Sequence, residues 1–223
     1  MIGAGRIGTL RARLAAKHPS VGFLAISDQD AGRAQALATT CGANLHSTDN
    51  YAMIERPEVH TVFVSTSEGE HAAPIIRALE LGKPVLVEKP IALNLADADA
   101  MVAAVDKAQA NVRVGYSRRY KERYLIAKEQ LVQGRLGKVV GAAARVYNSR
   151  AVAFNILKRD PHATPVLDVL TYYVDLACWL LEGNPPVEVV ARGQRAAIAM
   201  KLFEEGGAAL LPFLDKLGSG LGV

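Results

Sequence analysis

Cysteine is scarce in this sequence, with only Cys41 and Cys178 among 223 residues. Two isolated thiols exclude a disulfide framework and a paired-thiol metal site, so we expect no metal and two thiols buried in helical segments. No apolar run approaches the roughly 18 residues of a membrane span, and the start lacks the pattern of a signal peptide. We therefore expect a cytoplasmic protein with no membrane partner.

Tracts of basic residues are also lacking. The 26 Lys and Arg residues exceed the 22 Asp and Glu residues, which gives a formal net charge of +4, but they are scattered along the chain. A nucleic-acid-binding protein usually gathers its basic residues on one face or in one tract, so we expect no nucleic-acid partner. Half of the residues are hydrophobic, which suffices for one large domain or two modest ones.

The first half of the sequence alternates short β-branched runs with helical runs. This alternation is typical of a parallel sheet covered by helices on both faces. The predicted strands span residues 21–27, 60–66, 84–89 and 112–116. The predicted helices span residues 6–17, 31–40 and 70–81, and a further helix follows Asn94 as its N-cap. We therefore predict a doubly wound α/β Rossmann domain over residues 1–118.

The second half has a different pattern, which predicts an α+β domain over residues 119–223. Helices are predicted over residues 119–133 and 164–182, the latter with Thr164 as N-cap, Pro165 at its first position and Gly183 past its end. Strands are predicted over residues 138–148, 187–194, 196–203 and 208–214, the last two joined by a turn at 205–207.

A glycine-rich turn opens the first helix, in the sequence Gly3-Ala4-Gly5-Arg6-Ile7-Gly8. In a dinucleotide site the first glycine allows a tight turn, the second lets the backbone approach a pyrophosphate, and the third permits close packing of the helix. Asp28 ends the next strand, where a carboxylate hydrogen-bonds the adenosine ribose and repels a 2′-phosphate. We therefore predict NAD as the cofactor, with NADP as the alternative, rather than an ordinary glycine turn with a surface aspartate.

Two further places could carry chemistry. Lys89 ends a predicted parallel strand in Glu88-Lys89-Pro90, at the sheet edge where such sheets bind ligands, although a lysine there is more often a solvated charge. Asp168, Tyr172 and Asp175 share one face of the 164–182 helix, opposite an apolar stripe. Composition alone makes that polar face a solvated surface. The apolar stripe consists of Leu167, Leu170, Val174, Cys178 and Leu181.

Together these motifs resemble the Gfo/Idh/MocA family of nucleotide-dependent oxidoreductases over about residues 1 to 190. The similar segments are Gly3 to Gly8, Ser27-Asp28, residues 78–90, residues 115–120 and residues 168–181. The resemblance implies a Rossmann domain followed by a domain with an open, mostly antiparallel sheet. It also implies a hydride transfer between NAD(P) and a polyol-, inositol- or sugar-like alcohol, and, if the sheet is complete, a homodimer or homotetramer.

The resemblance implies roles for individual residues. Lys89, Tyr172 and Asp168 would be catalytic, with Tyr172 in the place of the usual histidine and Asp168 orienting the substrate. Arg118 and Asn148 would join Asp168 in binding substrate. The cofactor would contact the residues already named in the glycine turn and at Asp28, together with Ser65, Thr66, Glu88 and Lys89. A free tyrosine is a poor base at neutral pH, and an ammonium at Lys89 would favour its phenolate.

The sequence departs from the family pattern at both ends. Only Met1 and Ile2 precede Gly3, where the family has a central first strand, and the family continues well beyond Val223. We therefore expect an incomplete second-domain sheet, and a chain less stable than one extended upstream by a few apolar residues. These departures are compatible with a start placed too far downstream, with a gene fragment and with a trimmed chain. A non-catalytic dinucleotide-binding protein or an inactive fragment is the alternative function, and the substrate stays open.

Overall fold

The computed structural model describes residues 1–149, 152, 155–156 and 166–192. Residues 1–182 form one compact unit and residues 183–223 a second one. In the second unit only residues 183–192 are described, and they form neither helix nor strand. The predicted strands over 196–203 and 208–214 lie outside the described residues, as do Thr164 and Pro165. The fold below is that of the first unit.

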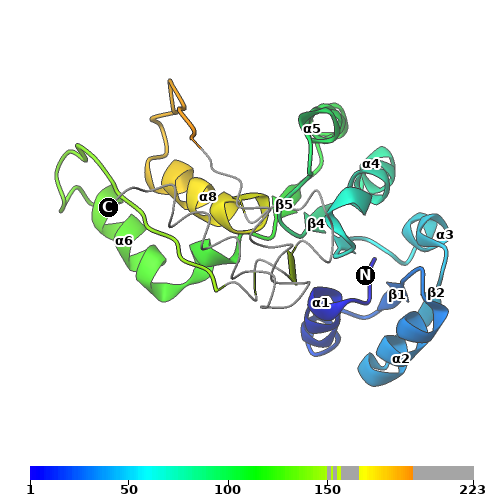
Figure 1. The fold of residues 1–223 in the computed structure, drawn as a ribbon. Coiled ribbons are helices and arrows are strands. Elements are labelled where there is room, and N and C mark those ends of the chain that lie inside the picture. The colour runs from blue at the N-terminus through cyan, green and yellow to red at the C-terminus, as the bar shows by residue number, and fades with distance from the viewer. Residues whose placement is uncertain (150–151, 153–154, 157–165, 193–223) are drawn as a thin grey trace, which may run out of the picture. The chain divides into compact units, whose positions relative to one another are not determined.

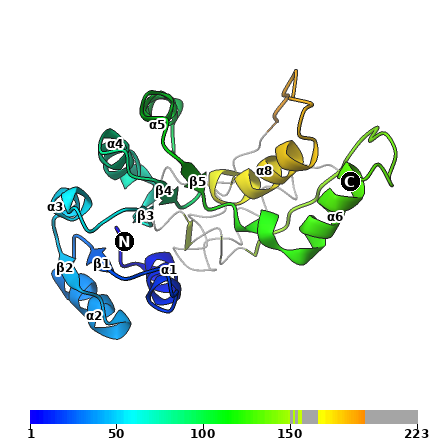
Figure 2. The ribbon, with the colours of Figure 1, turned by 180° about the vertical axis from the view of Figure 1, so that it is seen from behind.

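The amino-terminal part contains a parallel sheet, as the alternating pattern predicts. Its strands are β1 (Ala25–Ser27), β2 (Leu45–Ser47), β3 (Val62–Val64), β4 (Val85–Val87) and β5 (Val112–Val114). β1 pairs with β2, and β4 lies between β3 and β5, each pair in parallel. Helices cover both faces, with α1 and α2 on one side and α3, α4 and α5 on the other (Figures 1 and 2).

Met1 and Ile2 join the two groups of strands. Ile2 forms parallel bridges with both Ser27 of β1 and Val64 of β3, and it is 2% exposed. The Met1 amino group donates a 2.7 Å hydrogen bond to the Ala25 carbonyl. These two residues thus hold the central place in the strand order. Met1 also lines a cavity of about 710 Å³, together with residues 20–25, residues 57–61 and Phe63. Burial lowers the pKa of the Met1 ammonium to about 5.

The helices begin and end where local chemistry favours it. α1 (Arg6–Ala16) follows the glycine turn, and α2 (Ala31–Cys41) is capped by the Asp30 carboxylate, which accepts from the Arg33 N–H. α4 (Ala72–Glu80) follows a short 3₁₀ helix, η1 (Glu68–Glu70), and ends near Gly82 at φ 66°. α5 (Leu95–Ala108) has the predicted Asn94 N-cap, whose side chain accepts from the Asp97 N–H.

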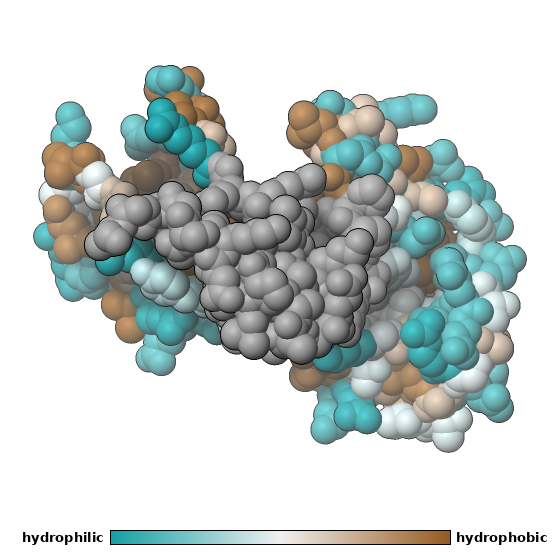
Figure 3. All heavy atoms as spheres, viewed as in Figure 1, coloured by the Kyte–Doolittle hydropathy of each residue, from teal (hydrophilic) through white to brown (hydrophobic). Residues whose placement is uncertain are grey.

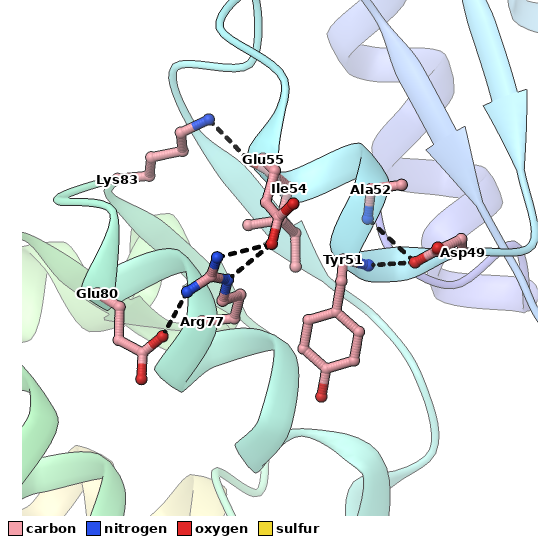
Figure 4. A network of polar contacts seen from close by, with 8 residues as sticks. All are labelled: Asp49, Tyr51, Ala52, Ile54, Glu55, Arg77, Glu80 and Lys83. Atoms are coloured by element: carbon pink, nitrogen blue, oxygen red, sulfur yellow. Dashed lines mark hydrogen bonds and ion pairs between the residues drawn. The ribbon is translucent and has the colours of Figure 1, made fainter.

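One strand and one helix of this part are absent from the sequence-based prediction, namely β2 and α3 (Asn50–Glu55). Polar contacts fix α3 in place (Figure 4). The Asp49 carboxylate caps its first turn, and Arg77 of α4 bridges to Glu55 at 2.6 Å and to Glu80 at 2.8 Å. Lys83 donates to the carbonyls of Ile54 and Arg56, which completes the end of the helix.

The remaining regular elements of the first unit are helical where the structure describes them. A 3₁₀ turn, η2 (Ser117–Tyr120), leads into α6 (Glu122–Val132), which ends near Gly134 at φ 69°. A π-helical turn, η3 (Val166–Leu170), leads into α8 (Thr171–Leu180), and Gly183 follows at φ 88°. Among the described residues, none of these helices has the length and apolar character to cross a membrane.

The strands predicted over residues 138–148 and at 187–192 are wrong for the part that the structure describes. Both segments lack regular structure, and side chains such as Val140 and Val187 are 96% and 100% exposed. A β-branched run becomes a strand only when a neighbouring strand takes up its backbone hydrogen bonds. The segments predicted to be those neighbours, 196–203 and 208–214, lie outside the described residues.

The two faces of α8 are reversed relative to the prediction from composition. Asp175 is buried and Tyr172 is half-buried, whereas Val174 and Leu170 of the apolar stripe are 54% and 43% exposed. Cys178 is exposed as well, and Cys41 is only half-buried, so the expectation of two buried thiols is wrong. The polar face turns inward because its carboxylates find cationic partners there. Figure 3 shows hydrophobic and hydrophilic residues interspersed over the rest of the visible surface.

Candidate active site

The glycine turn has the geometry that each of its three glycines predicts. A Cβ on Gly3, which lies at φ 94°, would come within 2.6 Å of the Ser65 carbonyl oxygen. A Cβ on Gly8 would come within 1.9 Å of the Gly3 carbonyl oxygen, so α1 packs directly on the turn. A Cβ on Gly5 would meet nothing within 4 Å. The middle glycine therefore leaves open space at the amino end of α1, where an anionic group can approach the backbone.

Asp28 ties the end of β1 to this turn. One carboxylate oxygen accepts the Ala4 N–H at 2.7 Å, and the other accepts the Asp30 N–H at 2.9 Å. Arg33 of α2 lies 2.9 Å from the second oxygen. The Asp28 side chain is 8% exposed, so the carboxylate is positioned by three donors while it still borders open space beside the turn.

A single cavity of about 700 Å³ connects this turn with the carboxyl ends of β3 and β4. Most of the predicted site residues line it. They are Gly3, Gly5, Arg6, Ile7, Asp28, Ser65, Thr66, Glu88, Lys89, Asp168 and Tyr172. Gly8 is packed beneath the turn and does not line the cavity. Parallel strands place their carboxyl ends at one sheet edge, which explains why segments distant in sequence meet here.

Lys89 and Asp168 form an ion pair at one end of the cavity. The Lys89 ammonium donates to the Asp168 carboxylate at 2.7 Å and to the Asp168 backbone carbonyl at 2.9 Å. Their side chains are 13% and 15% exposed. A pair screened this far from bulk water is held more firmly than a surface pair. Lys89 is therefore fixed toward α8 rather than extended into solvent.

The ring of Tyr172 is close to two cations. The Lys89 ammonium is 5.0 Å from the centre of its ring, and the Arg118 guanidinium is 4.8 Å from it. Arg118 also lies over the ring of Tyr173 at 4.6 Å. The expected proximity of Lys89 and Tyr172 is thus present at the ring. In the described part of the chain, no hydrogen bond joins the Lys89 nitrogen to the Tyr172 hydroxyl.

Glu88 has partners that hold it away from the middle of the cavity. Arg11 of α1 donates to its carboxylate through two nitrogens, at 2.7 and 2.6 Å. The same carboxylate packs on Gly115, where a Cβ would come within 2.9 Å of it. Glu88 therefore links α1, β4 and the end of β5. It borders the predicted cofactor site as an anchor for the strand end that carries Lys89.

His71 is a site residue that the sequence analysis missed. It is 1% exposed, it lines the cavity, and its Nδ1 lies 3.0 Å from the Pro90 carbonyl and 3.3 Å from the Ile91 carbonyl. Burial lowers the pKa of His71, against the opposing effect of nearby carbonyls and of Glu68. A signal was available, because His71 follows the carboxyl end of a predicted parallel strand, as Lys89 does.

Asn148 is the one predicted substrate residue that the structure does not bring to this site. It is exposed within the irregular segment 138–148 and does not line the cavity. Arg118 reaches the site only through its contact with Tyr172. The described residues gather no group of three or more His, Cys, Asp and Glu side chains that could hold a metal ion.

Comparison with known proteins agrees with the geometry. The family model described as the oxidoreductase family with an NAD-binding Rossmann fold matches residues 1–116, and the model of the Gfo/Idh/MocA C-terminal domain matches residues 124–213. A myo-inositol 2-dehydrogenase of Thermotoga maritima is 30% identical over 203 residues, which cover 86% of this chain and 57% of that protein. An inositol 2-dehydrogenase of Gluconacetobacter diazotrophicus is 31% identical over 214 residues, or 95% of this chain and 62% of that protein.

A solved structure supports the fold. The scyllo-inositol dehydrogenase of Lactobacillus casei, solved with bound NAD(H) and scyllo-inositol, superposes with a TM-score of 0.71 at 22% identity and covers 80% of this chain and 54% of that one. The chain thus spans little more than half the length of the proteins it matches. The glycine turn, the parallel sheet and the two family models lead to one assignment: this chain belongs to the Gfo/Idh/MocA family of oxidoreductases.

Proposed function

We propose that this protein is an NAD-dependent dehydrogenase that oxidises a secondary alcohol of a polyol-, inositol- or sugar-like substrate. The observation that carries the proposal is the single cavity with the glycine turn and Asp28 at one end and Lys89, Asp168 and Tyr172 at the other. The relatives whose names record inositol dehydrogenases support the substrate class. We also place the boundary of the two domains at residues 118/119, between the two matched family models.

The residues of the turn fit a dinucleotide. The open space at Gly5 suits a pyrophosphate at the amino end of α1, and Arg6 adds a positive charge there. Asp28 suits a ribose hydroxyl, because its Oδ2 accepts only the Ala4 N–H among the described donors and keeps a lone pair, whereas Oδ1 already accepts from Asp30 and Arg33. Ser65 and Thr66, after β3, would face the cofactor along the cavity. Bound NAD⁺ supplies the hydride acceptor of the reaction.

The other end of the cavity would hold and deprotonate the substrate. Asp168 accepts a hydrogen bond from a substrate hydroxyl, and Lys89 donates one to the reacting oxygen. The proton of the reacting hydroxyl would pass to the unit formed by Lys89 and Tyr172, while the hydride would pass from the substrate carbon to the cofactor. A protonated amine and a neutral phenol are both unable to accept it, so the unit first releases a proton to solvent. Turnover should therefore rise with pH.

A substrate panel tests the proposal. The protein is mixed with NAD⁺ and with myo-inositol, scyllo-inositol, glucose or levoglucosan, and NADH is followed by its absorbance. We expect the protein to form NADH with at least one cyclic polyol or sugar. The Lys89→Met variant should form no NADH with any of them. NADH binding without turnover on any of these alcohols would contradict the proposed reaction and favour a non-catalytic dinucleotide-binding protein.

A further inference from the structure

The backbone that carries Lys89 leaves the sheet just before this residue. The parallel ladder ends with the Glu88 N–H bonded to the Val64 carbonyl at 3.0 Å. In the described part of the chain, no backbone–backbone hydrogen bond involves Lys89, Pro90 or Ile91. A segment without such bonds depends on side chains for a fixed conformation. Arg11 holds Glu88 on one side of Lys89, and the imidazole of His71 is the group that holds the other side.

The hydrogen-bond pattern defines the state of the His71 ring. Both oxygens near Nδ1 belong to carbonyls, which can only accept, so Nδ1 carries the proton. Nε2 is fully buried and meets no hydrogen-bond partner among the described residues, and a neutral ring leaves it unprotonated. Burial lowers the pKa of His71, which agrees with a neutral ring at pH 7. The ring therefore acts as a fixed donor to the Pro90–Ile91 backbone.

We propose that His71 is a positioning residue that fixes Lys89 against Asp168 and Tyr172 by holding the carbonyls of Pro90 and Ile91. The distance from Nδ1 to the Pro90 carbonyl, 3.0 Å, is that of an ordinary N–H···O bond. Lys89 is the residue immediately before this contact, and its ammonium is in turn bonded to Asp168 at 2.7 Å. Loss of the Nδ1 donor frees the 89–91 backbone and lets the ammonium leave Asp168. The proposal rests on the proposed function only in that the proposed function assigns Lys89 a catalytic role.

Two substitutions separate the donor from the packing of the ring. His71→Phe keeps a ring of similar size in the buried site but has no donor. His71→Asn loses the ring but keeps an N–H that can reach a carbonyl. His46→Phe and His46→Asn are matched controls on β2, where the histidine is exposed.

The measurement is the rate at which each lysine is acetylated under trace labelling, read by mass spectrometry of peptides. Lys83, which donates to the carbonyls of Ile54 and Arg56 beside α3, is the internal reference. We expect His71→Phe to raise the labelling of Lys89 about tenfold relative to Lys83, equivalent to about 1.4 kcal/mol of lost restraint. His71→Asn should stay close to the unmodified protein.

If His71→Asn raised the labelling of Lys89 and His71→Phe did not, the ring would act by packing, and the proposal would be overturned. A parallel rise of Lys83 and Lys89 in His71→Phe would overturn it too, because the restraint would then not be specific to Lys89. The labelling needs neither cofactor nor substrate. A separate NADH titration of the same samples tests the proposed function, so failure of one idea leaves the other measurable.

Discussion

Lys89 and Asp168 lie 79 positions apart in the sequence, yet the ammonium of one donates to both the carboxylate and the backbone carbonyl of the other. This pair joins the end of β4 to the turn before α8. It also places Tyr172, one helical turn beyond Asp168, with its ring 5.0 Å from the same ammonium. The proposed chemistry depends on this junction.

Lys89 and Tyr172 should behave as one proton-handling unit. Tyr172→Phe keeps the ring beside the two cations and removes only the hydroxyl, so we expect α8 to stay packed while turnover falls by about 10²- to 10⁴-fold. Lys89→Met should cause a comparable loss. The double variant should lose far less than the product of the two, because groups that serve one step are not additive.

Steady-state rates of the four proteins from pH 6 to 10 check this prediction. Unchanged turnover of Tyr172→Phe across that range would remove Tyr172 from the chemistry and leave Lys89 as the base. Multiplicative losses would show that the two side chains serve separate steps.

Cofactor preference should depend on Asp28. Asp28→Asn keeps an acceptor for the glycine turn but removes the charge that repels a 2′-phosphate, and Arg33 then lies free to contact that phosphate. We expect NADH affinity to fall about tenfold and NADPH affinity to rise. Fluorescence titrations with both cofactors measure the change, with exposed Asp106→Asn as the control. Equal affinity of the unmodified protein for NADH and NADPH would refute the NAD preference.

Asp175 should make Arg119 important for stability. Arg119 donates to both oxygens of this carboxylate, whose side chain is 6% exposed, so η2 is fastened to α8. Arg119→Met leaves a buried charge without its partner, and we expect the free energy of unfolding to fall by about 3 kcal/mol. Arg119→Met combined with Asp175→Leu should recover much of the loss.

Urea denaturation of the single and double variants measures this difference. Arg123→Met on α6 is the control, because among the described side chains its guanidinium contacts only the neighbouring Tyr124. A single variant as stable as the unmodified protein would show that the pair contributes nothing.

When the chain is expressed from Met1, acid should weaken its fold through the Met1 amine. Its pKa is lowered from 8.0 to about 5 in the folded chain, so between these values the unfolded chain holds a proton that the folded chain lacks. The free energy of unfolding should therefore fall as the pH decreases from 8 to 5, by up to about 4 kcal/mol. His71, whose pKa is also lowered by burial, acts in the same direction below its usual range.

The control for the pH effect is the Nα-acetylated chain, which cannot ionise there. Its amide still has an N–H for the Ala25 carbonyl, and the adjoining cavity of about 710 Å³ has room for the acetyl group. We expect a shallower dependence of stability on pH after acetylation. If stability depended on pH equally in both chains, groups other than the Met1 amine would cause the effect.

The sequence predicts the parts of this fold that local chemistry controls. The Asn94 cap, the glycine turn and the buried parallel strands follow from residue types and their periodicity. β2 escaped prediction because its three residues, Leu45-His46-Ser47, form no apolar or β-branched run. The reversed faces of α8 could not be read from its own residues, since Asp175 turns inward only because Arg119, 56 positions earlier, is there to meet it. The position of His71 after a predicted parallel strand was a readable signal, but its contact with the distant Pro90 carbonyl was not.

The most direct test of the central claim is NADH binding by a Gly5→Ala variant. Gly5 has φ −69°, which alanine adopts readily, and its Cβ would meet no protein atom within 4 Å, so the fold should be unaffected. The added methyl would instead occupy the place where a pyrophosphate approaches the turn. Gly22→Ala, which is equally free of contacts and lies outside the site, is the matched control. By calorimetric titration we predict that the Kd for NADH rises at least about tenfold in Gly5→Ala, that it is unchanged in Gly22→Ala, and that both variants melt as the unmodified protein does. A Gly5→Ala variant that binds NADH as tightly as the unmodified protein would contradict the assignment of this cavity as the dinucleotide site.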